Sequence, residues 1–121
     1  QQGGRKEEGS ILGGLGNLGC DALVNCTPVG MFGGPEPNRS PIAVEHLGER
    51  SACAVVFDTV YNPVRTPLLE QASLAGHRTI DGVGMFVRQA AEQFTAWTGH
   101  PAPAALFERV CREALQERMG P

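Results

Sequence analysis

The sequence has no long hydrophobic run, no cluster of basic residues and no paired cysteine motif. Its 121 residues include 10 Lys and Arg against 13 Asp and Glu, which gives a net charge of −3 and a pI near 5.6. Because the basic residues are few and scattered, a broad nucleic-acid surface is excluded. No stretch is long enough for a transmembrane helix, and the polar residues 1–10 are not a signal peptide.

The cysteines and histidines form none of the patterns that mark a metal centre or a disulfide framework. The four cysteines show neither a CxxC pair nor a CxxC…HxxxH spacing, and the three histidines have no partners at triad or metal spacing. The sequence therefore predicts no metal site, and the residues alone assign no catalytic group. Because Cys53 and Cys111 lie in apolar stretches, we expect both to be buried free thiols, which fits a reducing cytoplasm.

Glycine, by contrast, is abundant and concentrated at the start of the chain. Seven of the 16 glycines fall within residues 1–19, which predicts a glycine-rich flexible opening followed by one domain over residues 20–121. The opening contains GLGNLG (Gly14–Gly19), which satisfies the G-x-G-x-x-G pattern of dinucleotide sites. That pattern needs a strand before it and a helix after it. Only Ile11-Leu12 precede it and a strand-like stretch follows, so a flexible glycine loop is the better interpretation.

Three short apolar stretches alternate with helical patterns along the rest of the chain. The strand-like stretches are Ala22–Asn25, Ala54–Asp58 and His77–Ile80, and the helix-like stretches are Pro67–Ala75, Gly84–Thr98 and Ala104–Met119. Strand-helix alternation implies right-handed crossovers and a parallel sheet. The predicted fold class is α/β: a partial Rossmann-like three-layer fold, with a short parallel sheet flanked by helices and further helices at the C-terminus.

The predicted helices carry local signals of their own. Thr66 and Pro67 are typical of an N-cap and a first helical position. The apolar stripe of the second helix ends in Trp97, which we expect in the core. In the third helix, Glu108 and Arg112 are spaced to pair across one turn.

Each predicted strand ends in a polar residue beside a glycine or proline loop. These residues are Asn25, Asp58 and Asp81. Parallel strands place such ends on one edge of the sheet, where open α/β proteins bind their ligands. We therefore expect a ligand site at this edge, with Asp58 in the structural role of accepting hydrogen bonds from turn N–H groups.

At these strand ends the sequence resembles shikimate dehydrogenase. The matching motifs are NCTPVGM (Asn25–Met31), DTVYNPVRTPLL (Asp58–Leu69) and DGVGMFVRQAAEQFTAWTG (Asp81–Gly99). They occur in the family's order and cover nearly everything after the glycine-rich opening. The resemblance implies NADPH-dependent reduction of 3-dehydroshikimate to shikimate, on the way to chorismate and the aromatic amino acids. It implies that this chain is the second half of the Rossmann-like cofactor domain plus the closing helices.

The resemblance also implies eight site residues, two at the substrate and six along the NADP. They are Tyr61 and Gln89 for the substrate, Thr59, Gly82 and Met85 beside the nicotinamide, and Cys26, Thr27 and Pro28 along the ribose and phosphates.

Several of these residues have plainer interpretations. Thr59 stands where relatives more usually carry a larger apolar residue, and Cys26 stands where alanine is common. From the residues alone, Tyr61 is a turn tyrosine whose ring packs on the following helix. Gln89 alone is a helix-surface glutamine, and Met85 alone fills the core.

The family's proton donors, a lysine and an aspartate of an N-terminal substrate domain, have no counterpart here. Lys6 is the only lysine, and no motif surrounds it. We therefore expect this chain to need that substrate domain as a partner and to be inactive alone. Two alternatives stay open: a quinate/shikimate dehydrogenase that uses NAD, and a non-catalytic regulatory domain that senses a metabolite.

A truncated sheet leaves the strand at Ala22–Asn25 with an unpaired edge, which invites pairing with another chain. The sequence therefore predicts a homodimer, a strand-exchanged oligomer or a companion chain along this edge.

Overall fold

The computed structural model describes residues 20–43 and 53–120, so the predicted flexible opening and its GLGNLG motif lie outside the described residues. Six elements follow one another in the described parts. They are β1 (Cys20–Asn25), β2 (Cys53–Asp58), α1 (Pro67–Leu74), β3 (Arg78–Ile80), α2 (Val83–Thr98) and α3 (Ala104–Met119). The predicted order of the three strands and three helices is confirmed.

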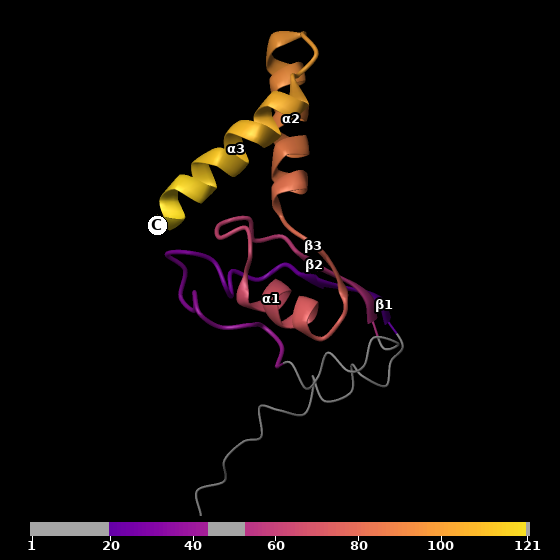
Figure 1. The fold of residues 1–121 in the computed structure, drawn as a ribbon. Helices are drawn as coiled ribbons and strands as arrows, with labels where there is room; N and C mark the ends of the chain where they lie inside the picture. Colours follow the sequence, from indigo (N-terminus) through magenta and orange to yellow (C-terminus); the bar gives the residue numbers. More distant parts are fainter. Residues whose placement is uncertain (1–19, 44–52, 121) are drawn as a thin grey trace, which may run out of the picture.

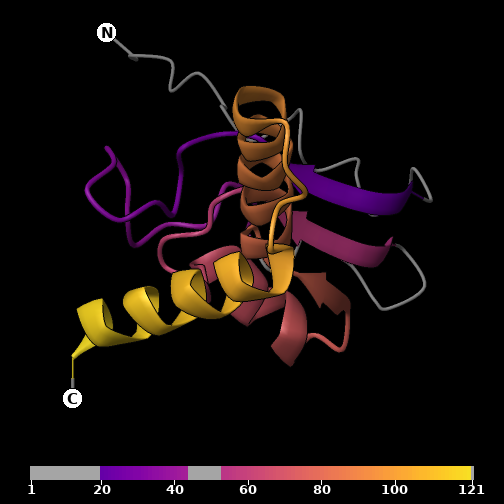
Figure 2. The same cartoon turned by 90° about the horizontal axis from the view of Figure 1, so that it is seen from above.

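The three strands form one parallel sheet in the order β1-β2-β3. The register pairs Asn25 of β1 with Asp58 of β2, and Phe57 of β2 with Ile80 of β3. All three strands therefore end at one edge, and in Figure 2 the arrowheads of β1 and β2 point together toward the side where α3 and the loop after β1 lie. The predicted α/β class with a short parallel sheet is confirmed.

Helix α1 supplies the apolar cover of the sheet. Its residues Leu68, Leu69 and Ala72 form one buried cluster with Val56 of β2 and with Ile42. Helix α1 begins where the sequence predicts, because Pro67 is its first residue and the Thr66 hydroxyl accepts a hydrogen bond from the N–H of Leu69 at 3.3 Å.

Helices α2 and α3 form a hairpin that extends away from the sheet (Figure 1). Val83 and Val87 of α2 pack against Leu115 of α3. Farther out, the rings of Phe94 and Phe107 meet edge to face with centroids 5.6 Å apart. None of the described helices is long and apolar enough to cross a membrane.

Three core predictions differ from the structure. The interpretation of Met85 as a core residue is wrong, because its side chain, in the first turn of α2, is 47% exposed. Trp97 is 79% exposed, because it lies in the last turn of α2, at the far end of the hairpin. The prediction that it belongs to the core is wrong. Cys111 is a free cysteine and is half-buried, while the side chain of Cys53 lies outside the described residues.

Candidate functional site

The edge of the sheet is built around Asp58, the last residue of β2, whose side chain is fully buried. One carboxylate oxygen accepts hydrogen bonds from the Asn25 amide and the Val60 N–H, both at 3.0 Å. The other accepts a hydrogen bond from the Thr66 hydroxyl at 2.6 Å. Asp58 therefore ties together the end of β1, the turn after β2 and the N-cap of α1, and the structural role predicted for it is confirmed.

Asn25 extends this network into the loop after β1. Its side-chain oxygen accepts hydrogen bonds from the N–H and the hydroxyl of Thr27, at 3.0 and 2.7 Å. Its backbone oxygen accepts two from Thr59, one from the N–H at 3.1 Å and one from the hydroxyl at 2.8 Å. Because one residue holds both Thr27 and Thr59, the loops after β1 and β2 have a fixed separation.

The loop after β3 meets the loop after β2 at Gly82. A Cβ atom at this position would lie 2.6 Å from the backbone oxygen of Thr59 and 2.7 Å from that of Val60. Both distances are shorter than real Cβ contacts, so only glycine fits without moving the backbone. The three strand-end loops therefore share one rim.

A groove of about 960 Å³ lies between this rim and the α2–α3 hairpin. This volume suits a small-molecule or cofactor site. The phenol ring of Tyr61 stacks on Phe86 of α2, with centroids 4.2 Å apart and planes 20° apart. The groove is lined mainly by apolar and neutral side chains: Cys26, Thr27, Pro28, Met31, Phe32, Thr59, Val60, Tyr61, Asn62, Phe86, Val87, Ala90, Leu106, Phe107, Val110, Cys111, Ala114, Leu115 and Arg118.

The eight predicted site residues divide into two groups. Five of them line the groove: Cys26, Thr27, Pro28, Thr59 and Tyr61. Gly82 is buried in the turn beneath the Thr59 carbonyl, whereas Met85 and Gln89 are exposed and are not part of the groove lining. Met85 and Gln89 are four residues apart on α2, so they share a face of the helix beside the one that carries Phe86.

The polar groups of Tyr61 and Gln89 are available to a ligand. Tyr61 is 37% exposed, and its ring stacks on Phe86. The turn position predicted packing on the following helix, which is α1, whereas the observed stack is on Phe86 of α2. The stack leaves the hydroxyl without a hydrogen-bond partner among the described residues.

The sequence did not assign Arg118 or Cys111 to the groove. Arg118 is the one charged side chain in the lining given above, and it comes from the last turn of α3. Burial raises the pKa of the Cys111 thiol, with neighbouring Arg112 opposing the shift and Asp81 adding to it. Cys111 is therefore a protonated thiol near neutral pH and not an activated nucleophile.

Comparisons with known proteins place the chain in one family. Residues 82–116 match the model of the shikimate 5'-dehydrogenase C-terminal domain. A shikimate dehydrogenase (NADP(+)) of Methanocella arvoryzae is 43% identical over 113 residues, which cover 88% of this chain and 40% of that protein. The chain thus spans well under half the length of this relative.

Solved structures agree with the sequence comparison. Shikimate 5-dehydrogenase of Thermus thermophilus in complex with NADP(H) and shikimate superimposes with a TM-score of 0.71 at 30% identity, over 85% of this chain and 36% of that one. Quinate dehydrogenase of Corynebacterium glutamicum in complex with NAD gives a TM-score of 0.63 at 32% identity, over 74% and 29% of the two chains. By sequence and by fold, this chain belongs to the shikimate dehydrogenase family and corresponds to the C-terminal part of its members.

Proposed function

We propose that the chain is the cofactor-domain portion of an enzyme that reversibly reduces 3-dehydroshikimate to shikimate with NADPH. The observation that carries this proposal is the shared rim of the three strand-end loops, because the loops that meet there hold the family's motifs. The relatives described above, a shikimate dehydrogenase (NADP(+)) and an enzyme in complex with NADP(H) and shikimate, support the choice of NADP and of shikimate.

The groove suits the nicotinamide end of a dinucleotide. Its lining is mainly apolar, which suits a flat aromatic ring. Gly82 and Met85 at the start of α2, together with Thr59, would border that ring. Cys26, Thr27 and Pro28 would follow the ribose and phosphates. When bound, NADPH supplies the hydride.

The substrate would be held by Tyr61 and Gln89. The Tyr61 hydroxyl can donate or accept one hydrogen bond, and the Gln89 amide can do both at once. These groups suit a ring that carries hydroxyls and a carboxylate. By fixing that ring, they would hold the carbonyl carbon of the substrate close enough to the nicotinamide for hydride transfer.

Reduction of a ketone also requires a proton donor, and the family resemblance does not assign this role to Tyr61 or Gln89. We place the donor in an N-terminal substrate domain, as the family resemblance implies, so the chain alone is proposed to bind ligands weakly and to be inactive. The proposed setting is the cytoplasm.

A titration of the chain followed by amide NMR tests the ligand assignment. With NADP⁺ at millimolar concentration, we expect shifts at the amides of Thr27, Thr59 and Gly82, with a dissociation constant well above the micromolar range. NAD⁺, shikimate and quinate are titrated in parallel. Tighter binding of NAD⁺ and quinate would favour the quinate enzyme. Submicromolar affinity for NADP⁺ or shikimate, or shifts confined to other surfaces, would contradict the proposal.

The outer edge of β1 is the proposed contact for a further strand. In the described part of the chain, β1 has a strand neighbour on one side only, and Val24 is 46% exposed. We expect sedimentation velocity to show association that increases with concentration, and Val24→Lys to weaken it because a charge on an edge strand opposes pairing. A monomer at every concentration would contradict this contact.

A further inference from the structure

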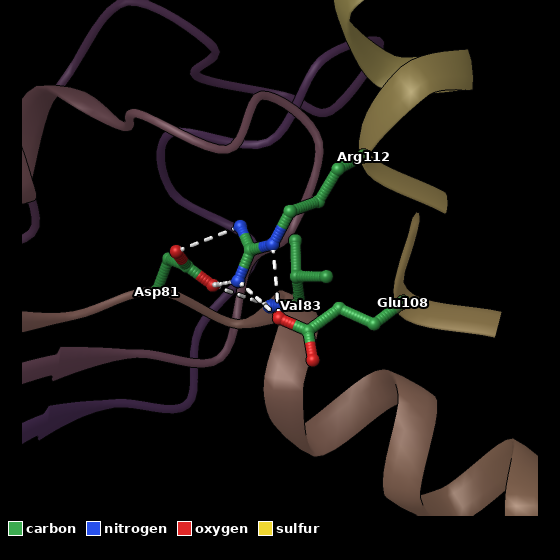
Figure 3. Close-up of polar contacts among 4 residues, drawn as sticks. All are labelled: Asp81, Val83, Glu108 and Arg112. Atoms are coloured by element: carbon green, nitrogen blue, oxygen red, sulfur yellow. Dashed lines mark hydrogen bonds and ion pairs between the residues drawn. The ribbon is translucent and has the colours of Figure 1, made fainter. Parts of the chain in front are cut away.

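Arg112, in the middle of α3, reaches across to the loop that follows β3. Its guanidinium donates from Nη1 to Oδ2 of Asp81 at 3.1 Å and from Nη2 to Oδ1 at 3.4 Å, although the two residues are 31 positions apart in the sequence. Figure 3 shows this two-point contact. Such a pairing fixes the direction of both groups, because the planar guanidinium matches the carboxylate in two places.

A second carboxylate holds Arg112 from its own helix. Nε and Nη2 both lie 3.0 Å from Oε1 of Glu108, one turn earlier in α3. The predicted Glu108–Arg112 pair is confirmed, and it orients the guanidinium toward Asp81. The hydrogen bond to Asp81 is the largest cause of a raised Arg112 pKa. The guanidinium therefore keeps its positive charge.

Asp81 in turn fixes the first turn of α2. Its Oδ1 accepts a hydrogen bond from the N–H of Val83 at 3.0 Å, in a helix whose N-cap, Gly82, offers no side chain. Gly82 lies between these two residues and rests against the Thr59 carbonyl. The turn is therefore held from one side by the loop after β2 and from the other by Arg112.

We propose that Arg112 is a positioning residue that acts through Asp81. It fixes the direction in which α2 leaves the rim, and with it Gly82 and Met85, which the proposed function places beside the nicotinamide. The side chains of Arg112 and Asp81 are 36% and 28% exposed, so solvent weakens the contribution of the pair to folding, and the two-point geometry serves to fix direction. The inference depends on the proposed function only for the identity of the ligand, NADP.

A double-mutant cycle tests this inference on the full chain. Arg112→Gln is expected to weaken NADP⁺ binding about tenfold and to shift the amide signals of Gly82, Val83 and Met85, while the urea midpoint changes little. In an Asp81→Asn background, the same substitution should change the NADP⁺ affinity less than about twofold, because position 81 then has no carboxylate for Arg112 to orient.

Two further variants complete the design. Glu108→Gln keeps a side-chain oxygen that can accept from the Arg112 guanidinium, so the contact with Asp81 stays in place and NADP⁺ affinity should remain within about twofold of the parent. Arg112→Lys keeps the positive charge but cannot make the two-point contact of a guanidinium. Its NADP⁺ affinity should therefore lie between those of Arg112→Gln and the parent. An equal effect of Arg112→Gln in both backgrounds, or shifts spread over the whole domain with a lower urea midpoint, would overturn the inference.

The amide NMR signals of the chain without ligand test this inference separately from the proposed function. If the parent chain shows no shifts with NADP⁺, the ligand assignment fails. The role of Arg112 in fixing the turn is still decided by the Gly82 and Val83 signals without ligand. Unchanged signals in Arg112→Gln would then overturn it.

Discussion

Replacing Asp58 by alanine is expected to lower the free energy of unfolding by about 3 kcal/mol. The substitution removes the acceptor for three groups at once, the Asn25 amide, the Val60 N–H and the Thr66 hydroxyl. All three donors point at the Asp58 side chain, which is fully buried. Leaving buried donors without partners costs more than the hydrogen bonds themselves contribute. Urea unfolding followed by circular dichroism measures the loss.

Two comparison variants make this result specific. Asp58→Asn keeps one side-chain oxygen for Asn25 and Val60 but cannot accept from Thr66 with its amide nitrogen, so its cost should be smaller, about 1–2 kcal/mol. Arg39→Ala removes a side chain that is 71% exposed in an ion pair with Glu36 and should change stability by less than about 0.5 kcal/mol. Equal stability of Asp58→Ala and Arg39→Ala would contradict the role given to Asp58.

The strand ends were predictable because local chemistry marks them. A buried apolar run that stops at Asn25 or Asp58 leaves a polar side chain at the edge of the sheet, and parallel pairing then sets these side chains opposite each other. The helix start at Thr66 was predictable for the same reason, since an N-cap and the proline after it are adjacent in sequence.

The contacts that complete the rim were not predictable, because they join distant residues. The sequence offers a partner for Arg112 at Glu108, one helical turn away, but nothing in it indicates Asp81. The need for glycine at position 82 arises from the backbone of Thr59, which no local pattern reveals.

The apolar stripe of α2 was misread for a related reason. A helical stripe indicates a face that is buried against something, but not what buries it. Leu115 is buried, whereas Val110 is 52% exposed and lines the groove. Trp97 continues the stripe of α2 beyond the contact with α3, so its exposure follows from where the hairpin ends.

The second large effect is expected in a hybrid enzyme. Residues 20–120 of this chain replace the matching segment of the Thermus thermophilus shikimate dehydrogenase, to which the fold is similar over 85% of this chain. We expect the hybrid to oxidise shikimate with NADP⁺. Tyr61→Phe should then lower kcat/KM about 10- to 100-fold, because it removes the one hydroxyl proposed to contact the substrate ring from this loop.

The matched control is Arg65→Ala, which removes an exposed side chain that pairs with Glu70 away from the groove lining, and should leave kcat/KM unchanged. Circular dichroism and NADP⁺ binding of each hybrid show that it is folded. A metabolite-sensing domain would bind the ligands in this setting without turnover, and a quinate enzyme would prefer quinate with NAD⁺.

The rate of NADPH formation from shikimate and NADP⁺ by this hybrid decides whether the rim and the groove belong to a shikimate dehydrogenase. The rim and groove described here predict turnover that depends on shikimate and falls with Tyr61→Phe. A folded hybrid that binds NADP⁺ but forms no NADPH, or one that is unaffected by Tyr61→Phe, would contradict that assignment.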